Sequence, residues 1–233
     1  MTVNNAQIEI CCPSADAAFA AEKAKAGRIE LCRNLETGGL TPSTSDIMRV
    51  ANILDIPVNV LIRPREGNFV YTEEEVEQML DSVKFCGIPG AVDGVVIGAL
   101  NEDGSVDIPT CKRLISLARE FRMSVTFHRA MDEPGDIFRR LEEVIFLGVD
   151  RVLSSGGAPT AEEGIDTLAR MVEIAGKRTR IMPGCGVTPE NAVQILEKTR
   201  AHEIHGSRVS IIKAIRQSGS SKKSKPNAPT QGK

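Results

Sequence analysis

Short runs of apolar and β-branched residues alternate along this chain with longer stretches whose apolar positions recur at helical spacing. We predict eight of the short runs as strands, because each is apolar enough to be buried on both faces. The expected strands are Gln7–Cys12, Arg28–Arg33, Val58–Arg63, Asp93–Ala99, Ser124–Arg129, Asp150–Ser155, Arg178–Met182 and His202–Ser207. Strands that alternate with helices in this way are typical of a parallel sheet covered by helices.

Eight consecutive strand–helix units predict a single α/β domain, a TIM-type (β/α)8 barrel, over residues 1–215. A chain of 233 residues is long enough to bury one such core. The eighth helix is expected to be short or altered, since only residues 208–217 remain for it. We expect the Lys- and Ser-rich tail at 216–233 to be disordered; the alternative is a weak arm for an anionic partner.

Composition excludes several classes of partner. The formal charge of -2 is spread along the chain and leaves no basic stripe for nucleic acid. No apolar run approaches the roughly 20 residues that a membrane span needs, and the first residues do not resemble a signal peptide. We therefore expect a cytoplasmic protein, in which the six cysteines remain thiols.

Polar residues interrupt the predicted strands at alternate positions. Ile8-Glu9-Ile10-Cys11 and Ile29-Glu30-Leu31-Cys32 repeat one Glu-x-Cys pattern, so if the aliphatic side chains face the helices, the Glu and Cys side chains face the barrel interior. The same alternation predicts further inward polar side chains in later strands: Arg63, His128, Glu203 and His205.

This polar interior favours a functional site, because the interior of a structural barrel is normally filled by Val, Ile and Leu. The candidate catalytic residues are Glu9, Glu30, Arg63, His128 and His205. Alternatively, Glu9 and Glu30 form ion pairs that hold the barrel floor, and each histidine only hydrogen-bonds a carboxylate.

Two features are candidates for binding a small anion. Arg63 and Arg65 offer forked guanidinium donors, and glycine-rich turns after the last three strands let backbone amides approach phosphate or carboxylate. The loop residues assigned to substrate binding are Gly156, Gly157, Gly184, Gly186 and Ser207. The alternative is that these glycines serve only tight turns.

Cys11 and Cys32 are the candidate metal ligands. Neighbouring strands lie about 4.8 Å apart, so matching positions on the first two strands would bring the two thiols together. In a reducing compartment, paired thiolates suit Cu(I), which we expect in near-linear two-sulfur coordination with nearby arginines lowering the thiol pKa values. Zinc is less favoured because no CxxC pair or compact Cys/His cluster supplies four ligands, although His128 or His205 could contribute one. Both cysteines can also be small buried hydrophobes, and Cys185 falls in a loop.

A colinear series of motifs over residues 7–207 resembles the CutC family, which is associated with copper homeostasis. The motifs are Glu9-Ile10-Cys11, Arg28-Ile29-Glu30-Leu31-Cys32, Gly38-Gly39-Leu40-Thr41-Pro42-Ser43, Ile62-Arg63-Pro64-Arg65, Asp93-Gly94-Val95-Val96-Ile97-Gly98-Ala99-Leu100, Val125-Thr126-Phe127-His128-Arg129-Ala130, Arg151-Val152-Leu153-Ser154-Ser155-Gly156, Met182-Pro183-Gly184 and Glu203-Ile204-His205. The resemblance implies a cytoplasmic TIM-type barrel that forms homo-oligomers. It also implies that Cys11 and Cys32 occupy positions where family members are proposed to bind Cu(I).

Two functions therefore remain open. The leading hypothesis is a Cu(I)-binding protein of copper homeostasis with Cys11 and Cys32 as ligands. The alternative is an enzyme for a small anionic metabolite, with His128 or Glu30 as general base and the arginines and loop glycines holding the anion. No motif fixes a reaction.

Overall fold

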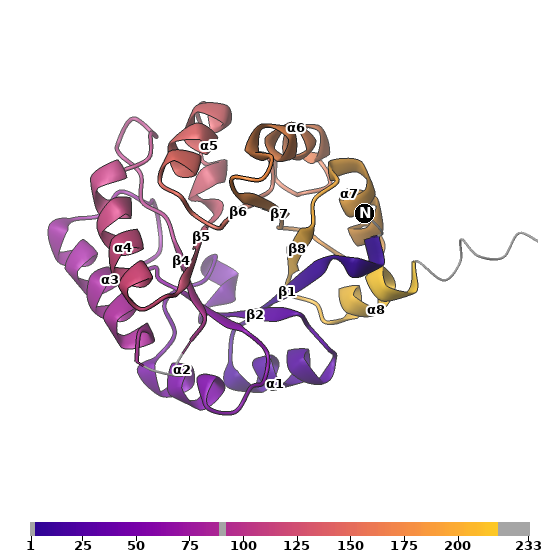
Figure 1. Cartoon of the computed structure of the whole chain (residues 1–233), viewed down its shortest axis with the longest axis horizontal. Helices are drawn as coiled ribbons and strands as arrows, with labels where there is room; N and C mark the ends of the chain where they lie inside the picture. The colour runs from indigo at the N-terminus through magenta and orange to yellow at the C-terminus, as the bar shows by residue number, and fades with distance from the viewer. Residues whose placement is uncertain (1–2, 89–91, 219–233) are drawn as a thin grey trace, which may run out of the picture.

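The computed structural model describes residues 3–88 and 92–218, and within them eight parallel strands form an inner ring surrounded by helices (Figure 1). The strands are β1 Gln7–Cys12, β2 Arg28–Leu31, β3 Val58–Leu61, β4 Gly94–Ile97, β5 Ser124–Phe127, β6 Arg151–Ser154, β7 Arg180–Pro183 and β8 Glu203–Gly206. The α-helices are α1 Ala15–Lys23, α2 Thr44–Ala51, α3 Glu73–Cys86, α4 Ile108–Glu120, α5 Ile137–Phe146, α6 Ile165–Ala175, α7 Ala192–Thr199 and α8 Ser210–Gln217. Three short 3-10 helices span Val3–Asn5, Leu35–Thr37 and Arg129–Asp132.

The strands pair in the order β7-β6-β5-β4-β3-β2-β1-β8, so the first strand bridges the second and the last. β7 and β8 lie side by side and complete the ring, although no hydrogen-bonded ladder joins them within the described residues. The predicted single α/β domain with a TIM-type barrel is therefore confirmed, in a near-closed form.

Local sequence explains where helices begin. At the start of α3, Thr72 Oγ1 accepts a hydrogen bond from Glu75 N–H (3.3 Å), and the Glu75 carboxylate accepts one from Thr72 N–H (2.9 Å), which forms a capping box. The eighth helix is short, as predicted, at eight residues. The predicted tail beyond it lies outside the described residues from 219 onwards. No helix in the described part of the chain is long and apolar enough to cross a bilayer.

Strand alternation separates the barrel interior from the layer against the helices. Ile8, Ile10 and Cys12 belong to the large apolar core. Cys11 and Cys32 belong to a smaller inner cluster, together with Leu61, Val96 and the partly buried Leu35. The two Glu-x-Cys patterns therefore face the barrel interior, as predicted.

The predicted register of β1 against β2 is wrong by two residues. Cys11 is paired with Glu30 and Glu9 with Arg28, so the two cysteines are not at matching positions. Closing a barrel requires neighbouring strands to be staggered, which shifts equivalent sequence positions along the strand axis. The thiols nevertheless meet diagonally, with Cys11 Sγ and Cys32 Sγ 3.6 Å apart.

Candidate functional site

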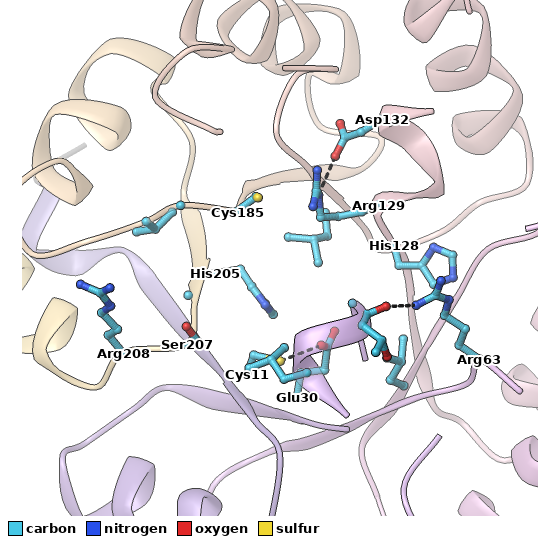
Figure 2. A pocket seen from close by; sticks show the side chains of 18 of the residues that line it. Cys11, Glu30, Arg63, His128, Arg129, Asp132, Cys185, His205, Ser207 and Arg208 are labelled. Atoms are coloured by element: carbon cyan, nitrogen blue, oxygen red, sulfur yellow. Dashed lines mark hydrogen bonds and ion pairs between the residues drawn. The ribbon is translucent and has the colours of Figure 1, made fainter. Parts of the chain in front are cut away.

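A cavity of about 480 Å³ opens at the carboxyl ends of the strands, where sites of this fold lie. Figure 2 shows side chains from several strands and the loops after them converging on it. The sequence-predicted residues that line the cavity are Cys11, Glu30, Arg63, His128, Gly186, His205 and Ser207. Glu9 and Cys32 lie behind this lining, with exposed fractions of 0% and 1%.

The cavity floor holds Cys11 between a second thiol and a carboxylate. The Cys11 thiol lies 3.4 Å from Glu30 Oε1, to which it donates, and 3.6 Å from Cys32 Sγ. Its hydrogen bond with Cys32, its burial and the charge of Glu30 raise the pKa of the Cys11 thiol. This contradicts the expectation that arginines lower the pKa, because the nearest charged group is an acid. Burial likewise raises the pKa of Glu30, whose Oε2 finds no hydrogen-bond partner among the described residues.

His205 approaches this floor from β8. Its Nδ1 lies 2.8 Å from Glu9 Oε1, and the two residues are also register partners on β1 and β8. Burial opposes a charge on His205, but the hydrogen bond with Glu9 and the charges of Glu30 and Glu9 outweigh it and raise the pKa of His205. Burial also opposes ionisation of Glu9, but Arg28 and His205 prevail and lower its pKa to about 2.

A network of buried charges lies beneath the site. Arg28 forms ion pairs with Glu9 and with Glu203, the latter at 2.7 Å, and Arg151 Nε lies 2.9 Å from the same Glu203 carboxylate oxygen. Asn59 donates a further hydrogen bond to Glu9 (3.1 Å). The alternative of ion pairs at the barrel floor therefore describes Glu9, whereas Glu30 remains without a cationic hydrogen-bond partner in the described chain.

His128 is buried in the cavity wall beside cations. Its Nδ1 accepts a hydrogen bond from Ala130 N–H (3.1 Å), so the neutral ring carries its proton on Nε2. Burial first, and then the charges of Arg63 and Arg129, lower the pKa of His128 to about 3. His128 is therefore a neutral imidazole at physiological pH.

Arg63 joins two loops at the cavity edge. Its Nη1 donates to the carbonyl oxygens of Thr37 (3.1 Å) and Gly39 (3.0 Å), and its Nη2 donates to Gly67 O (2.9 Å). Its guanidinium also stacks over the ring of Phe69, 5.0 Å from the centroid. Most of the N–H donors of Arg63 therefore hold the two loops that form this part of the cavity wall.

Arg65 does not join the cavity lining, although the sequence paired it with Arg63. Its Nε donates to Glu75 Oε1 (2.5 Å), and its two terminal nitrogens donate to Glu66, Asn68 and Val70. These bonds occupy the guanidinium fork that an anion would need.

The amides of the loop after β6 are also occupied. Asp132 Oδ1 accepts hydrogen bonds from Ser154 Oγ (2.6 Å) and Gly157 N–H (3.0 Å), and Ser155 N–H donates to both carboxylate oxygens. A carboxylate of the chain itself therefore sits where Gly157 was expected to hold an anion. Gly156 and Gly184 also lie outside the cavity lining, their amides donating to Ser154.

Several site residues were missed from the sequence. Arg28 precedes Glu30 by two positions, so the alternation used for Glu30 would have placed it in the interior. Asp132 follows β5 in a 3-10 helix, where no periodic signal marks it. The structure also places residues in the cavity lining that were not assigned to it, among them Arg129, Asp132, Glu133, Cys185 and Arg208.

One cluster can hold a metal ion. Among the described residues, Cys11, Glu30 and His205 form a group whose ligand atoms all lie within 4.8 Å of one another. All three are buried at the cavity floor. The set combines sulfur, oxygen and nitrogen donors from adjacent strands β1, β2 and β8.

Comparisons with known proteins agree with the fold and identify the family. A solved deoxyribose phosphate aldolase from Aeropyrum pernix has a TM-score of 0.68 at 13% identity, covering 93% of this chain and 91% of that one, and shows the fold alone. The solved CutC protein from Streptococcus agalactiae, for which a role in copper homeostasis has been proposed, has a TM-score of 0.82 at 31% identity, covering 88% and 99%.

The sequence matches are also extensive. A family protein CutC from Xylella fastidiosa (strain Temecula1 / ATCC 700964) is 46% identical over 212 residues, which cover 91% of this chain and 78% of that protein. The sequence pattern of the CutC family matches residues 6–210. This chain therefore belongs to the CutC family.

Proposed function

We propose that this chain takes part in copper homeostasis by binding Cu(I) through Cys11 and Cys32. The observation that carries the proposal is the contact between their sulfurs, 3.6 Å apart at the floor of an open cavity. Soft thiolate ligands select monovalent copper over harder ions. The role proposed for the Streptococcus agalactiae relative supports the same choice of metal.

The residues around the two thiols would shield a bound ion from water. Leu61 and Val96 form one buried cluster with the two cysteines inside the barrel, and the partly buried Leu35 packs against this cluster. An apolar shell of this kind limits the access of water to a metal. Because Cys11 lines the cavity and Cys32 lies behind it, an incoming ion meets Cys11 first.

Near-linear coordination requires the thiols to separate on binding. With metal–sulfur bonds of about 2.3 Å, the length found for zinc thiolates, two sulfurs on opposite sides of one ion lie about 4.6 Å apart. The observed 3.6 Å is shorter, so binding moves Cys11 and Cys32 apart by about 1 Å or leaves the coordination bent.

A competition titration against a Cu(I) chelator, under anaerobic and reducing conditions, tests the proposal. We expect one Cu(I) per wild-type chain and loss of tight binding in Cys11→Ser and Cys32→Ser. Cys185→Ser is the control, since Cys185 lines the cavity but its thiol donates to Pro159 O (3.2 Å). Thermal melts show that each variant is folded. Equal affinity in all four proteins would refute the site, and loss in Cys185→Ser alone would move it to the loop after β7.

A second candidate function is catalysis on a small anionic metabolite. The observation that favours it is the presence of three arginines in the cavity lining, Arg63, Arg129 and Arg208, which Glu30, Asp132 and Glu133 line as well. Arg208 forms no ion pair within residues 3–88 and 92–218, so its guanidinium is available to a ligand. Gly186 and Ser207, from the loops after β7 and β8, line the same cavity.

Thermal shift with a panel of sugar phosphates and small organic acids tests this second candidate. A ligand that binds only the folded protein raises its melting temperature with concentration. A shift that disappears in Arg208→Gln supports an anion site in this cavity. No shift at millimolar concentration, which reaches the upper end of typical KM values of about 1 μM to 1 mM, counts against the enzyme.

Homo-oligomeric assembly and cytoplasmic location stay predictions. Light scattering of the purified chain measures the assembly directly. A mass equal to that of one chain would refute the predicted oligomer.

A further inference from the structure

We propose that Cys11, Glu30 and His205 form a site for a divalent, borderline-soft cation such as Zn²⁺, with a fourth coordination position open to the cavity. This site is distinct from the Cys11–Cys32 pair, with which it shares only Cys11. The ligand class at the open position is water or an anionic group of a small molecule.

The spacing of the donors fits one ion. Bonds of about 2.3 Å to sulfur and about 2.1 Å to oxygen, in tetrahedral geometry, place the two ligand atoms about 3.6 Å apart. Cys11 Sγ and Glu30 Oε1 are 3.4 Å apart. The ligand atom of His205 lies within 4.8 Å of both, so the three donors surround a common position.

Glu9 fixes which nitrogen of His205 faces the ion. Because Nδ1 of His205 hydrogen-bonds Glu9 Oε1 at 2.8 Å, Nε2 is the nitrogen left for a ligand. Figure 2 shows His205 pointing from β8 toward Cys11 and Glu30. A carboxylate bonded to the distal nitrogen of a histidine orients the ring and raises its basicity in many metal sites, which makes Glu9 a positioning residue.

A buried atom without a partner points independently to a missing ligand. Glu30 is 4% exposed, yet its Oε2 has no hydrogen-bond partner in the described residues. An unsatisfied carboxylate oxygen in the interior is costly, and such groups are rare in folded proteins. A cation bound by the Glu30 carboxylate would offset the cost of burying this group.

Three protein ligands predict a metal site that keeps one coordination position open. Structural zinc sites have four protein ligands, whereas catalytic zinc sites have three and keep the fourth position for water or substrate. Here the three ligands lie at the floor of a cavity of about 480 Å³ that Arg129 and Arg208 also line. A ligand bound to the ion therefore lies in the same cavity as the guanidinium groups of Arg129 and Arg208. Since Cys11 serves both sites, Cu(I) and Zn²⁺ exclude each other.

Zinc binding by reduced protein, in competition with a chromophoric chelator, tests the inference. We expect one Zn²⁺ per wild-type chain, at least tenfold weaker binding in Glu30→Gln and His205→Gln, and a loss of about 10- to 100-fold in Glu9→Gln. Cys32→Ser is the discriminating variant and should keep its zinc affinity. Cobalt(II) loading gives a second readout, the visible absorption of a tetrahedral ion, which Cys32→Ser should retain.

The copper proposal and the zinc proposal can be refuted independently of each other. If both hold, Cys32→Ser loses Cu(I) and keeps Zn²⁺, while His205→Gln loses Zn²⁺ and keeps Cu(I), and Cys11→Ser loses both. Wild-type zinc affinity in folded His205→Gln and Glu30→Gln overturns the zinc site and leaves the copper proposal standing. Loss of zinc in Cys32→Ser equal to that in Cys11→Ser also overturns it, because the thiol pair is then the zinc site. Zinc binding without Cu(I) binding refutes the copper proposal alone.

Discussion

The carboxylate of Glu9 and the imidazole of His205 face each other across β1 and β8, with Oε1 2.8 Å from Nδ1. The other Glu9 oxygen pairs with Arg28, which also pairs with Glu203. The candidate metal site therefore rests on a layer of buried charges that fixes the orientation of His205. Removing one member takes a partner from each buried charge that it contacts.

Arg28→Met tests the contribution of this layer to stability. The substitution keeps much of the side-chain volume but leaves Glu9 and Glu203 without their shared cation. Breaking a buried pair by removing one partner costs about 3–5 kcal/mol. Chemical denaturation should show a lower free energy of unfolding by that amount. Arg178→Met is the matched control, because Arg178 and Glu142 form a pair that is more than half exposed on both sides, worth about 1 kcal/mol or less. Similar losses in the two variants would contradict the account.

His128 should make the protein less stable as the pH falls. Its pKa is lowered to about 3 in the folded state, whereas an unfolded histidine titrates near about 6.5. Between these values the unfolded chain binds the extra proton, so the free energy of unfolding decreases with falling pH by about 1.4 kcal/mol per pH unit. Denaturation at pH 7 and pH 5 measures the loss.

His128→Gln isolates this contribution, because the other titrating groups remain. The variant should lose less stability than the wild type over the same pH interval. Arg63 and Arg129 supply the positive charge that, after burial, disfavours the imidazolium. Parallel pH profiles for the two proteins would show that His128 is not held neutral by the fold.

Asp132→Ala should turn the loop after β6 into an anion site. Asp132 accepts from the amides of Ser155 and Gly157, and hydrogen bonds to a charged group contribute about 1.5–3 kcal/mol. The variant should melt at a lower temperature, and sulfate should recover part of the loss by filling the vacated position. Since sulfate also stabilises proteins in general, the wild type and chloride at equal ionic strength are the controls. An equal sulfate effect in both proteins would contradict the assignment.

The periodic pattern of the chain was sufficient to predict the barrel and the facing of its side chains. Ile8 and Ile10 pack outward and Cys11 faces inward because a strand alternates its side chains whatever the tertiary context. The contact between Cys11 and Cys32 was predicted for the wrong reason, since the stagger of β1 against β2 depends on closing the ring and leaves no local signal.

The sequence could not show which polar groups are already hydrogen-bonded to other residues of the fold. Arg65 and Gly157 have the chemistry that an anion requires, but Glu75 and Asp132 already take their hydrogen bonds. Both acids reach their partners only through tertiary packing. His205 lies at a strand end as predicted, but its bond to Glu9 connects residues at opposite ends of the chain.

X-ray absorption at the copper edge of the Cu(I)-loaded protein tests the central claim most directly, because it counts the sulfur atoms bound to the metal. We predict two sulfur neighbours in the wild type and in Cys185→Ser, and fewer than two, with weaker retention of copper, in Cys11→Ser and Cys32→Ser. Copper bound only by nitrogen and oxygen in the wild type, or two sulfur neighbours in a Cys11→Ser, Cys32→Ser double variant, would contradict it.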